Sequence, residues 1–347
     1  MSLILGIESS CDETASAVVR NGTEVLSNIV ASQDELHQEY SGVVPEIASR
    51  AHLERILPVI HKSIQKANTT LNEIDCIAVG NRPGLIGSLL VGVAAAKSLA
   101  WSIGKPLVAV DHVLAHLWAP SLCGEIPEYP ALGVVVSGGH TSLLKLENPS
   151  TALCIGKTID DAAGEAFDKA ASILELGWPG GALIDASSKE GTPTHKLPRP
   201  KLKNNKSDFS FSGLKTALLY GVRGNPSRKN GKPDFPYSAS SLTTQEKHNW
   251  AASFQEAIVD TIMRGVNDAV SNSEFRCIIA GGGVIANSLL RTQLSITSKA
   301  NNLPLLLPPH SLCVDNAAMV AGLGWHLFSN GQWADLELTA QPRGIAS

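Results

Sequence analysis

Two histidines stand four residues apart in the segment DHVLAHLWAP, residues 111–120 of a 347-residue chain. On a helix, positions i and i+4 project from one face, so His112 and His116 could bind one metal ion together. Two ligands do not complete a metal site, and histidines at this spacing are more often unrelated polar residues near a core. A metallopeptidase is disfavoured, because its HExxH motif needs a glutamate where this chain has Val113. The segment alone leaves both interpretations open.

The composition is that of a globular protein. Hydrophobic residues make up 44% of the chain and the formal net charge is −4. A chain of this length suggests about two domains. The start, MSLILGIESSCDET, shows no targeting leader, so we expect a cytoplasmic protein. Because every apolar run is broken before it reaches about 18 residues, we expect no contact with a membrane.

Hydrophobic periodicity predicts one order of elements twice. The first half has strands at 3–8, 15–20 and 24–31, a helix from Pro45, a strand at 74–80, a helix at 85–103 and a strand at 106–110. The second half has strands at 131–137, 141–147 and 152–158, a helix at 161–176, a long irregular stretch, a helix near 246–270, a strand at 276–282, a helix at 284–300 and a strand at 303–308. A last helix is expected near 316–328.

Three antiparallel strands followed by βαβ alternation, performed twice, are typical of the duplicated actin-like ATPase fold of sugar kinases and heat-shock chaperones. We therefore predict an α/β fold with two actin-like α/β domains and a ligand cleft between them. The first domain is expected at 1–128 and is completed by a C-terminal helix within about 313–347. The second is expected at 129–312, with a basic insertion at about 192–241.

In such a fold the turn after each first strand faces the cleft. Here these turns are residues 8–13 and 137–141, and the second contains glycines whose N–H groups could bind phosphate. Both could equally be plain hairpin turns. The glycine triplet at 281–283, between a strand and a helix, is a similar but weak phosphate-binding signal.

Several ordered blocks carry a family resemblance. They are ESSCDET (8–14), GVVPEIASRAH (42–52), RPGLIGSLLVG (82–92), DHVLAHLWAP, VSGGHT (136–141), DDAAGEAFDK (160–169), WPGG (178–181), FSFSGLKTA (209–217) and GGGVIAN (281–287). Together they resemble the bacterial-type TsaD family, the tRNA N6-adenosine threonylcarbamoyltransferases, once mislabelled O-sialoglycoprotein endopeptidases. The resemblance extends along nearly all of the chain.

The resemblance implies a reaction and its partners. The reaction is transfer of a threonylcarbamoyl group from threonylcarbamoyl-AMP to the exocyclic amine of the adenosine 3′ of the anticodon, in tRNAs that read codons beginning with A. It also implies a shortened paralogue (TsaB type) that binds the helices near 45–67 and 85–103, and a small ATPase (TsaE type). The helix that carries Ala48, Ala51 and His52 would form the paralogue contact.

The resemblance further implies a metal site and its ligands. It adds Asp315 to His112 and His116, which gives one divalent ion per subunit held by two histidines and one carboxylate. Such a set of nitrogen and oxygen donors with open positions suits Fe²⁺ or Zn²⁺.

The remaining site residues follow from the same resemblance. The acyl adenylate is expected at Val136, Ser137, Gly138, Gly139 and His140. Nucleotide contacts are expected at Asp168, Gly181, Asp185, Gly282, Gly283 and Asn287, although helix capping, solvated surface or a turn would explain these residue types without a ligand. Asp12 and Glu13 are the predicted catalytic residues, with Asp12 able to orient or deprotonate the attacking amine.

One segment is strongly basic. Residues 196–232 contain ten lysines or arginines and one acid, Asp208, with Phe209, Phe211 and Tyr220 among them. The segment could follow tRNA phosphates, or it could be a solvated basic loop. Two other functions remain open from the sequence: an ATP-dependent small-molecule kinase, and a non-catalytic nucleotide-binding scaffold with a structural metal.

Overall fold

The computed structural model describes the chain except for residues 41, 201, 203–206, 230–231 and 346–347. It contains two five-stranded sheets, in the orders β3-β2-β1-β4-β5 and β8-β7-β6-β11-β12. The strands of the first sheet are β1 (Leu3–Glu8), β2 (Thr14–Arg20), β3 (Glu24–Ala31), β4 (Cys76–Arg82) and β5 (Leu107–Asp111). Those of the second are β6 (Ala131–Val136), β7 (Thr141–Asn148), β8 (Thr151–Lys157), β11 (Cys277–Gly281) and β12 (Leu305–Leu306).

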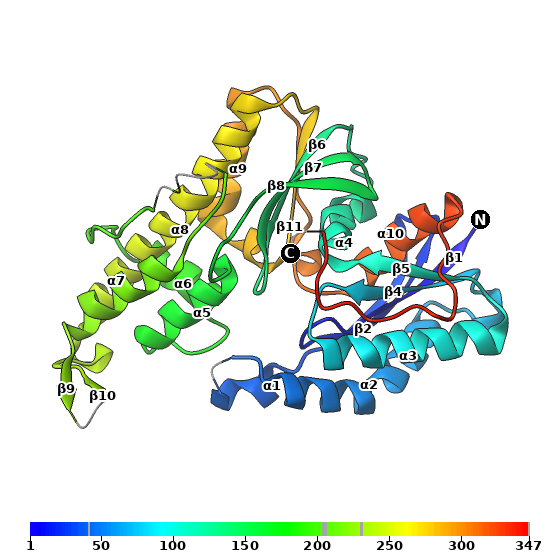
Figure 1. Ribbon diagram of the computed structural model, residues 1–347, viewed down its shortest axis with the longest axis horizontal. Coiled ribbons are helices and arrows are strands. Elements are labelled where there is room, and N and C mark those ends of the chain that lie inside the picture. Colours follow the sequence, from blue (N-terminus) through cyan, green and yellow to red (C-terminus); the bar gives the residue numbers. More distant parts are fainter. Residues whose placement is uncertain (41, 201, 203–206, 230–231, 346–347) are drawn as a thin grey trace.

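The two sheets repeat one topology. In each sheet three antiparallel strands come first, and two later strands add in parallel beside the first strand. The predicted duplication is therefore present in the strand order itself. Because parallel strands end at the same edge, the turns after β1 and β6 and the segments after β4, β5 and β11 are brought to the space between the two sheets (Figure 1).

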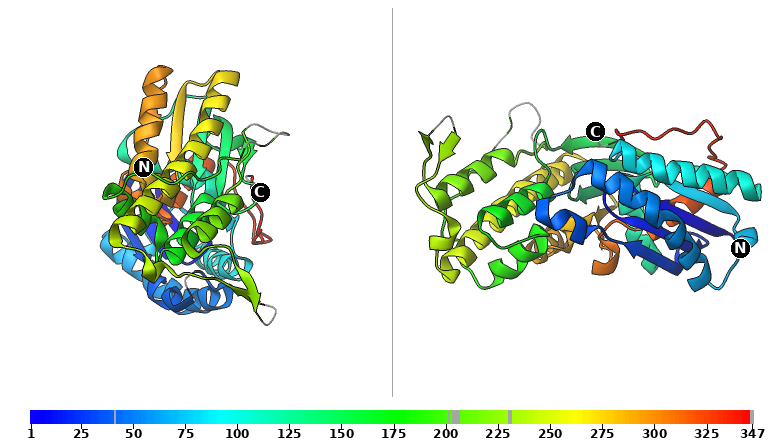
Figure 2. Two further views of the ribbon diagram at one scale, coloured as in Figure 1. Left: turned by 90° about the vertical axis from the view of Figure 1, so that its left-hand side faces the viewer. Right: turned by 90° about the horizontal axis from the view of Figure 1, so that it is seen from below.

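Helices cover both sheets. They are α1 (Asp34–His37), α2 (Pro45–Lys66), α3 (Ile86–Ile103), α4 (His112–Trp118), α5 (Ala163–Ile173), α6 (Gly180–Lys189), α7 (Ser212–Arg223), α8 (Thr244–Asn272), α9 (Ser288–Ala300) and α10 (Ala317–Ser329). A short hairpin, β9 (Ser227–Lys229) and β10 (Lys232–Asp234), follows α7. Helices α2 and α3 cover one face of the first sheet, and α5 to α9 lie on the outer side of the second (Figures 1 and 2).

The other face of the first sheet is covered by α4 and α10. Their side chains join residues of both sheets in one buried cluster, which includes Val110 and Ala15 from the first sheet and Val135 and Leu144 from the second. The helix that carries the two histidines is therefore packed between the sheets rather than on the surface.

Side-chain caps define where several of these helices begin. Thr243 and Glu246 form a capping box at the start of α8. The side chains of Asp111, Asn287 and Asn316 accept hydrogen bonds from the first turns of α4, α9 and α10. A cap satisfies N–H groups that have no partner inside the helix, so these residues set the helix starts that border the site.

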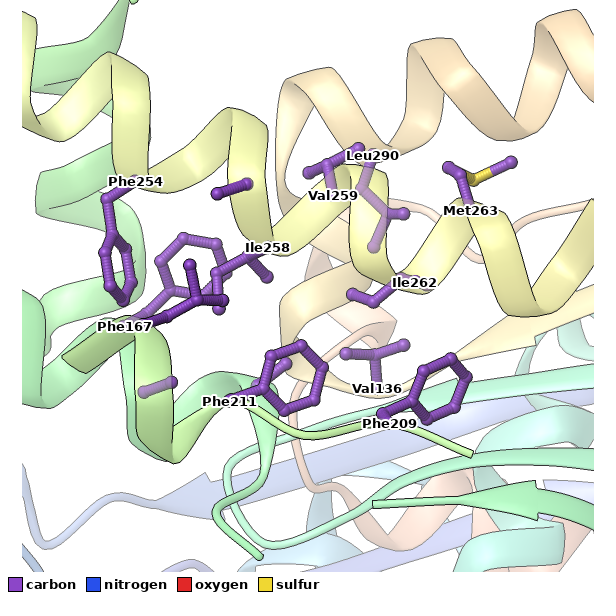
Figure 3. Packing of buried hydrophobic residues seen from close by; sticks show 14 of the residues in the cluster. Val136, Phe167, Phe209, Phe211, Phe254, Ile258, Val259, Ile262, Met263 and Leu290 are labelled. Atoms are coloured by element: carbon purple, nitrogen blue, oxygen red, sulfur yellow. The ribbon is translucent and has the colours of Figure 1, made fainter. Parts of the chain in front are cut away.

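Four phenylalanines lie close together in the core of the second half (Figure 3). Phe167 of α5 meets Phe254 of α8 at a ring-centroid distance of 6.1 Å, and Phe209 and Phe211 pack beside them. The expectation that Phe209 and Phe211 belong to an RNA-binding surface is therefore wrong, since they are 1% and 0% exposed. The fold uses this part of the basic segment to close its hydrophobic core.

Helix α3 is apolar on more than its buried face. By length and composition alone it could cross a membrane, and 33% of its apolar window is buried in the fold. Leu89, Val93 and Ala96 pack in the core, while Leu90 and Trp101 are 53% and 76% exposed. The buried face places α3 against the first sheet, and the helix also presents a second, exposed apolar face.

The largest differences from the sequence prediction fall after β8. The stretch expected to be irregular contains α6 and α7, which the periodicity did not reveal because α6 begins with two glycines and α7 follows a serine-rich turn. The helix expected from residue 284 begins at Ser288, since residues Gly283–Ala286 form a 3₁₀ turn and Asn287 caps the helix.

Candidate active site

A cavity of about 380 Å³ lies between the two sheets. Its walls come from the turns after β1 and β6 and from the ends of β4, β5 and β11. The lining residues are Ser10, Cys11, Asp12, Glu13, Pro83, Gly84, Leu85, His112, Ser137, Gly138, Gly139, His140, Gly283, Val314, Asp315 and Pro342. Two turns that the duplicated pattern predicted to face a cleft thus line one cavity.

His112 and Asp315 line this cavity, and the buried His116 lies next to them. One ligand atom from each residue lies within 4.8 Å of the others. The Asp315 Oδ1 atom is 3.4 Å from His112 Nε2 and 3.0 Å from His116 Nε2. The imidazole rings are 4.6 Å apart and nearly perpendicular. Residues separated by about two hundred positions in sequence therefore form one compact donor set.

The orientation of His116 fits a metal ligand. The residue is 1% exposed, yet neither ring nitrogen has a hydrogen-bond partner among the described residues. Its Nε2 atom is close to Asp315 but not oriented to donate to it. A buried imidazole without hydrogen bonds is costly, and a cation bound by Nε2 would offset that cost. The donor set of two imidazoles and one carboxylate fits Fe²⁺ or Zn²⁺.

Glu8 orients His112 from behind. Its Oε2 atom lies 3.0 Å from His112 Nδ1, so the Nδ1–H donates to the carboxylate and Nε2 faces Asp315. The same carboxylate accepts the N–H of Ser10, and Gly80 leaves the space in which it lies. A carboxylate behind a metal-binding histidine fixes the ring and its tautomer.

These charges shift the pKa values of the cluster. Burial acts to lower the pKa of His112, but Glu8 and Asp315 outweigh it and hold that pKa well above its usual value. Burial acts to raise the pKa of Asp315, yet the two histidines hold it well below its usual value. The pKa of His116 is lowered by burial. A metal ion would therefore displace a proton from His112 and find Asp315 already ionised.

Asp12 and Glu13 lie across the cavity from the metal set. Burial raises the pKa of Asp12. Burial, followed by the charge of Asp12, raises the pKa of Glu13 well above its usual value. Because the pKa is raised further for Glu13 than for Asp12, a proton on the pair favours Glu13 and Asp12 is the member that ionises more readily.

The turn that carries this pair is held by His52 of α2. His52 Nε2 donates to the carbonyl of Cys11 at 3.0 Å, and Thr14 Oγ1 donates to Nδ1 at 2.7 Å. Ala48, Ala51 and His52 are all buried. These three side chains face the core and the turn that carries Asp12 and Glu13, so a partner bound to α2 would contact other residues of the helix. The predicted contact between this helix and a paralogue stays a prediction.

The glycine-rich turn 137–140 is supported by its neighbours. Ser137 Oγ accepts the N–H of His140, and the carbonyls of Ser137 and Gly138 accept N–H groups from the start of α5. Gly164 allows this approach, because a Cβ there would lie 2.7 Å from the Gly138 Cα. Burial and the neighbouring histidines lower the pKa of His140 to about 4. His140 is thus neutral and lines the cavity.

A second cavity of about 510 Å³ adjoins the first. The two share Gly138, Gly283 and Val314. The rest of its lining is Gly164, Phe167, Asp168, Pro179, Gly181, Ala182, Asp185, Ala186, Lys189, Val284, Ala286, Asn287 and His310. Its mostly apolar wall with a few carboxylates has the size and character of a nucleoside site.

Several predicted nucleotide contacts in this cavity also hold the structure. Asp168 Oδ1 accepts the Gly180 N–H at 2.7 Å, and burial raises the pKa of Asp168. Asp185 accepts both donors of Ser288 and pairs with Lys189. Asn287 caps α9 and donates to Gln255. Nucleotide contact at these residues stays a prediction, and capping already accounts for Asn287.

Three predicted residues line neither cavity: His116, which lies beside His112 and Asp315, and Val136 and Gly282. The side chain of Val136 is buried in the core, and Gly282 lies behind it with a φ of 103° that favours glycine. Sequence reasoning missed Glu8 as the partner of His112, although its place at the end of a buried strand was a usable signal. It also missed Pro342, for which no sequence signal exists.

The basic segment is only partly free to bind an anion. Arg199 pairs with Glu256 and Asp260, and Lys215 pairs with Asp161. Lys201, Lys203 and Lys206 lie outside the described residues. Arg228 and Tyr220 are exposed, so they remain candidates for an RNA contact.

Solved structures with this arrangement define the class of fold. HypF from T. kodakarensis superposes with a TM-score of 0.60 at 14% identity, over 95% of this chain and 48% of that one. Component A of (R)-2-hydroxyglutaryl-CoA dehydratase from Acidaminococcus fermentans superposes with a TM-score of 0.53 at 12% identity, over 95% and 100%. The chain has the duplicated fold of the actin-like ATPases, as its sequence pattern predicted.

Sequence comparison then defines the family. The profile described as TsaD, tRNA N6-adenosine threonylcarbamoyltransferase, matches residues 24–322. The chain is 47% identical to the enzyme of that name from Treponema denticola over 98% of this chain and 96% of the relative. It is 47% identical to that from Geobacillus thermodenitrificans over 98% and 95%. The chain belongs to the family of tRNA N6-adenosine threonylcarbamoyltransferases.

Proposed function

We propose that this chain transfers the threonylcarbamoyl group of threonylcarbamoyl-AMP to the N6 amine of the adenosine 3′ of the anticodon, in tRNAs that read codons beginning with A. The observation that carries the proposal is the junction of the two cavities at Gly138 and Gly283. A nucleoside in the second cavity has its phosphate at this junction, and the acyl group then extends toward the acids and histidines of the first.

The donor is bound by its AMP portion. The base lies against the apolar wall formed in part by Phe167, and the carboxylates of Asp168 and Asp185 accept ribose hydroxyls. The phosphate lies against Gly138 and Gly139, where a Cβ would point into open space and backbone can approach an anion. This placement directs the carbonyl carbon into the first cavity.

The chemical step is nucleophilic substitution at that carbonyl. The adenosine N6 atom forms a bond to the carbonyl carbon, and the bond from this carbon to the AMP phosphate oxygen breaks with its electron pair on AMP. The amine proton passes to the carboxylate of Asp12, which later loses it to water. Asp12 suits this role because it ionises more readily than Glu13, and a protonated Glu13 can donate a hydrogen bond to the Asp12 carboxylate.

His112, His116 and Asp315 would hold one Fe²⁺ or Zn²⁺ ion. When bound, this ion supplies a Lewis acid that stabilises negative charge on the acyl phosphate oxygens. Glu8 keeps the Nε2 atom of His112 directed at the ion.

Protein partners fit the exposed apolar residues of the first domain. Leu53 and Leu57 of α2 are 66% and 64% exposed, beside Leu90 and Trp101 of α3. A shortened paralogue of the TsaB type binds this face, and a small ATPase of the TsaE type joins the complex. A hydrophobic face of this kind is typical of a protein interface. The enzyme works in the cytoplasm, away from any membrane.

The experiment supplies the protein and its partner proteins with unmodified tRNA, labelled threonine, bicarbonate and ATP. Label in tRNA as threonylcarbamoyladenosine supports the proposal. Phosphate transfer to a sugar or acid without labelled tRNA would instead indicate a kinase. Metal and nucleotide binding with neither reaction would indicate a scaffold.

A further inference from the structure

The C-terminal segment, residues 338–345, crosses the carboxyl ends of β4 and β5 without forming a helix or strand (Figure 1). Five hydrogen bonds to residues 338–342 hold it there. They are Gln341 N–H to the Asn81 carbonyl (2.8 Å), Asn81 Nδ2 to the Thr339 carbonyl (3.2 Å), Lys97 Nζ to the Leu338 carbonyl (3.2 Å), Gly84 N–H to the Pro342 carbonyl (3.4 Å) and Arg82 Nη1 to Gln341 Oε1 (3.5 Å). Most involve backbone groups, so the path of the segment is fixed closely.

This segment forms part of the first cavity. Pro342 lines it together with Pro83, Gly84 and Leu85, in the same cavity as His112 and Asp315. The family profile ends at residue 322, so the match itself says nothing of this segment.

The segment also reaches the helix that carries the two histidines. Asp111, 4% exposed, is the N-cap of α4. Its Oδ1 atom accepts the N–H groups of Val113 and Leu114, while its Oδ2 atom accepts the N–H of Ile345 at 3.3 Å and lies 3.4 Å from Arg82 Nε. One buried carboxylate therefore connects the tail on one side to the first turn of α4 on the other.

The approach of the tail is close. A Cβ on Gly344 would lie 2.7 Å from Pro83 Cδ and 2.9 Å from Asp111 Oδ2. The tail and the carboxylate therefore cannot keep their present positions if any side chain stands at Gly344. This fit leaves the carboxylate little freedom to rotate away from α4.

We infer that residues 338–345 belong to the active site, with Asp111 as a positioning residue. The tail holds the Asp111 carboxylate, this carboxylate fixes the start of α4, and the start of α4 sets the direction of His112 and His116. The expected effect on the transfer reaction rests on the proposed function, but the expected effect on the start of α4 does not. Helix α4 is short and its first turn is buried, so the N–H groups of that turn need the Asp111 carboxylate as their hydrogen-bond acceptor.

Three variants separate the parts of this connection. Asp111→Asn keeps an oxygen that can cap α4 but removes the acceptor for Ile345 and Arg82. Gly344→Ala displaces the tail and leaves Asp111 intact. A chain that stops after Glu337 removes the tail entirely. Asp75→Asn is the matched control, since Asp75 Oδ2 accepts the Leu3 N–H at 2.8 Å elsewhere on the same sheet.

The first measurement does not depend on activity. Hydrogen exchange of the Val113 and Leu114 amides should accelerate at least tenfold in Asp111→Asn, Gly344→Ala and the shortened chain, and stay unchanged in Asp75→Asn. Affinity for Zn²⁺, added alone, should fall about tenfold, which is the lower end of the effect of removing a support of a metal ligand. In the full transfer assay kcat should fall while KM for tRNA stays within twofold.

Combining Asp111→Asn with the shortened chain tests whether Asp111 acts through the tail. If it does, Asp111→Asn should add little loss in the shortened chain. Losses that multiply would contradict the inference, as would unchanged exchange and Zn²⁺ affinity in Asp111→Asn. If the shortened chain fails to fold, Asp111→Asn and Gly344→Ala still give the answer. A wild-type protein that binds Zn²⁺ but modifies no tRNA would refute the proposed function while the exchange and Zn²⁺ results continue to test the tail.

Discussion

Replacing Asp12 with asparagine tests the proposed base most sharply. The change keeps the size of a side chain in a cavity whose burial raises the pKa of Asp12, but it removes the group that accepts the amine proton. General base catalysis contributes roughly 10²- to 10⁴-fold to a rate. A loss of that size corresponds to about 3–5 kcal/mol in activation free energy. Asp12 must be ionised to act and its pKa is raised. The rate of wild-type transfer should therefore fall as the pH is lowered, and the fall should begin at a higher pH than for an aspartate with an ordinary pKa.

The assay is single-turnover transfer from isolated threonylcarbamoyl-AMP to tRNA, measured over a range of pH. Glu13→Gln is the matched control, because glutamine can still donate a hydrogen bond to Asp12, and we expect it to lose no more than about tenfold. Zn²⁺ affinity and AMP affinity should be unchanged in Asp12→Asn. Transfer by Asp12→Asn within a factor of ten of wild type would refute a base role, and loss of metal or AMP binding would make Asp12 structural.

Three further changes have expected outcomes. Glu8→Gln should weaken Zn²⁺ binding about 10- to 100-fold in a direct titration, because the partner of His112 loses its charge, and unchanged affinity would contradict that support. Gly164→Ala should raise KM for the donor, since the new Cβ would collide with the backbone of Gly138 and move the phosphate-binding turn; an unchanged KM would place the phosphate elsewhere. The folded state holds the Glu13 proton more tightly than the unfolded state, so its contribution to stability is lost as pH rises through the raised pKa. Glu13→Gln should therefore raise the unfolding temperature at pH 8, with a smaller difference at pH 4, and a lower unfolding temperature at pH 8 would refute this sign.

The order of strands was predictable from sequence because the strands of each half are marked by regular runs of hydrophobic residues. The three antiparallel strands and the parallel pair in each half were found in the predicted order. The helices α6 and α7 were not, because local sequence rich in glycine and serine gives little periodicity and tertiary packing stabilises them instead. Phe209 and Phe211 looked like surface aromatics among lysines, and only the packing against α8 revealed them as core residues.

The candidate site was less accessible to sequence reasoning alone. The spacing of His112 and His116 suggested one helix face, but Asp315 joined them through the family resemblance rather than through any local pattern. The helix that carries Ala48, Ala51 and His52 was predicted to contact a partner, but which of its side chains face outward depends on how α2 packs, and these three are buried. Contacts such as Asp111 with Ile345 join residues 234 positions apart, and no short-range pattern encodes them.

Under the proposed function, this chain forms threonylcarbamoyladenosine at the cavity that His112 and Asp315 line, beside the buried His116. The most direct measurement is mass spectrometry of nucleosides from tRNA incubated with the complete set of partners and either the wild type or the His112→Ala/His116→Ala double variant. We predict threonylcarbamoyladenosine 3′ of the anticodon with the wild type, and at least a hundredfold less with a folded double variant that still binds AMP. Absence of the product with the wild type, or an equal amount with the double variant, would contradict the account.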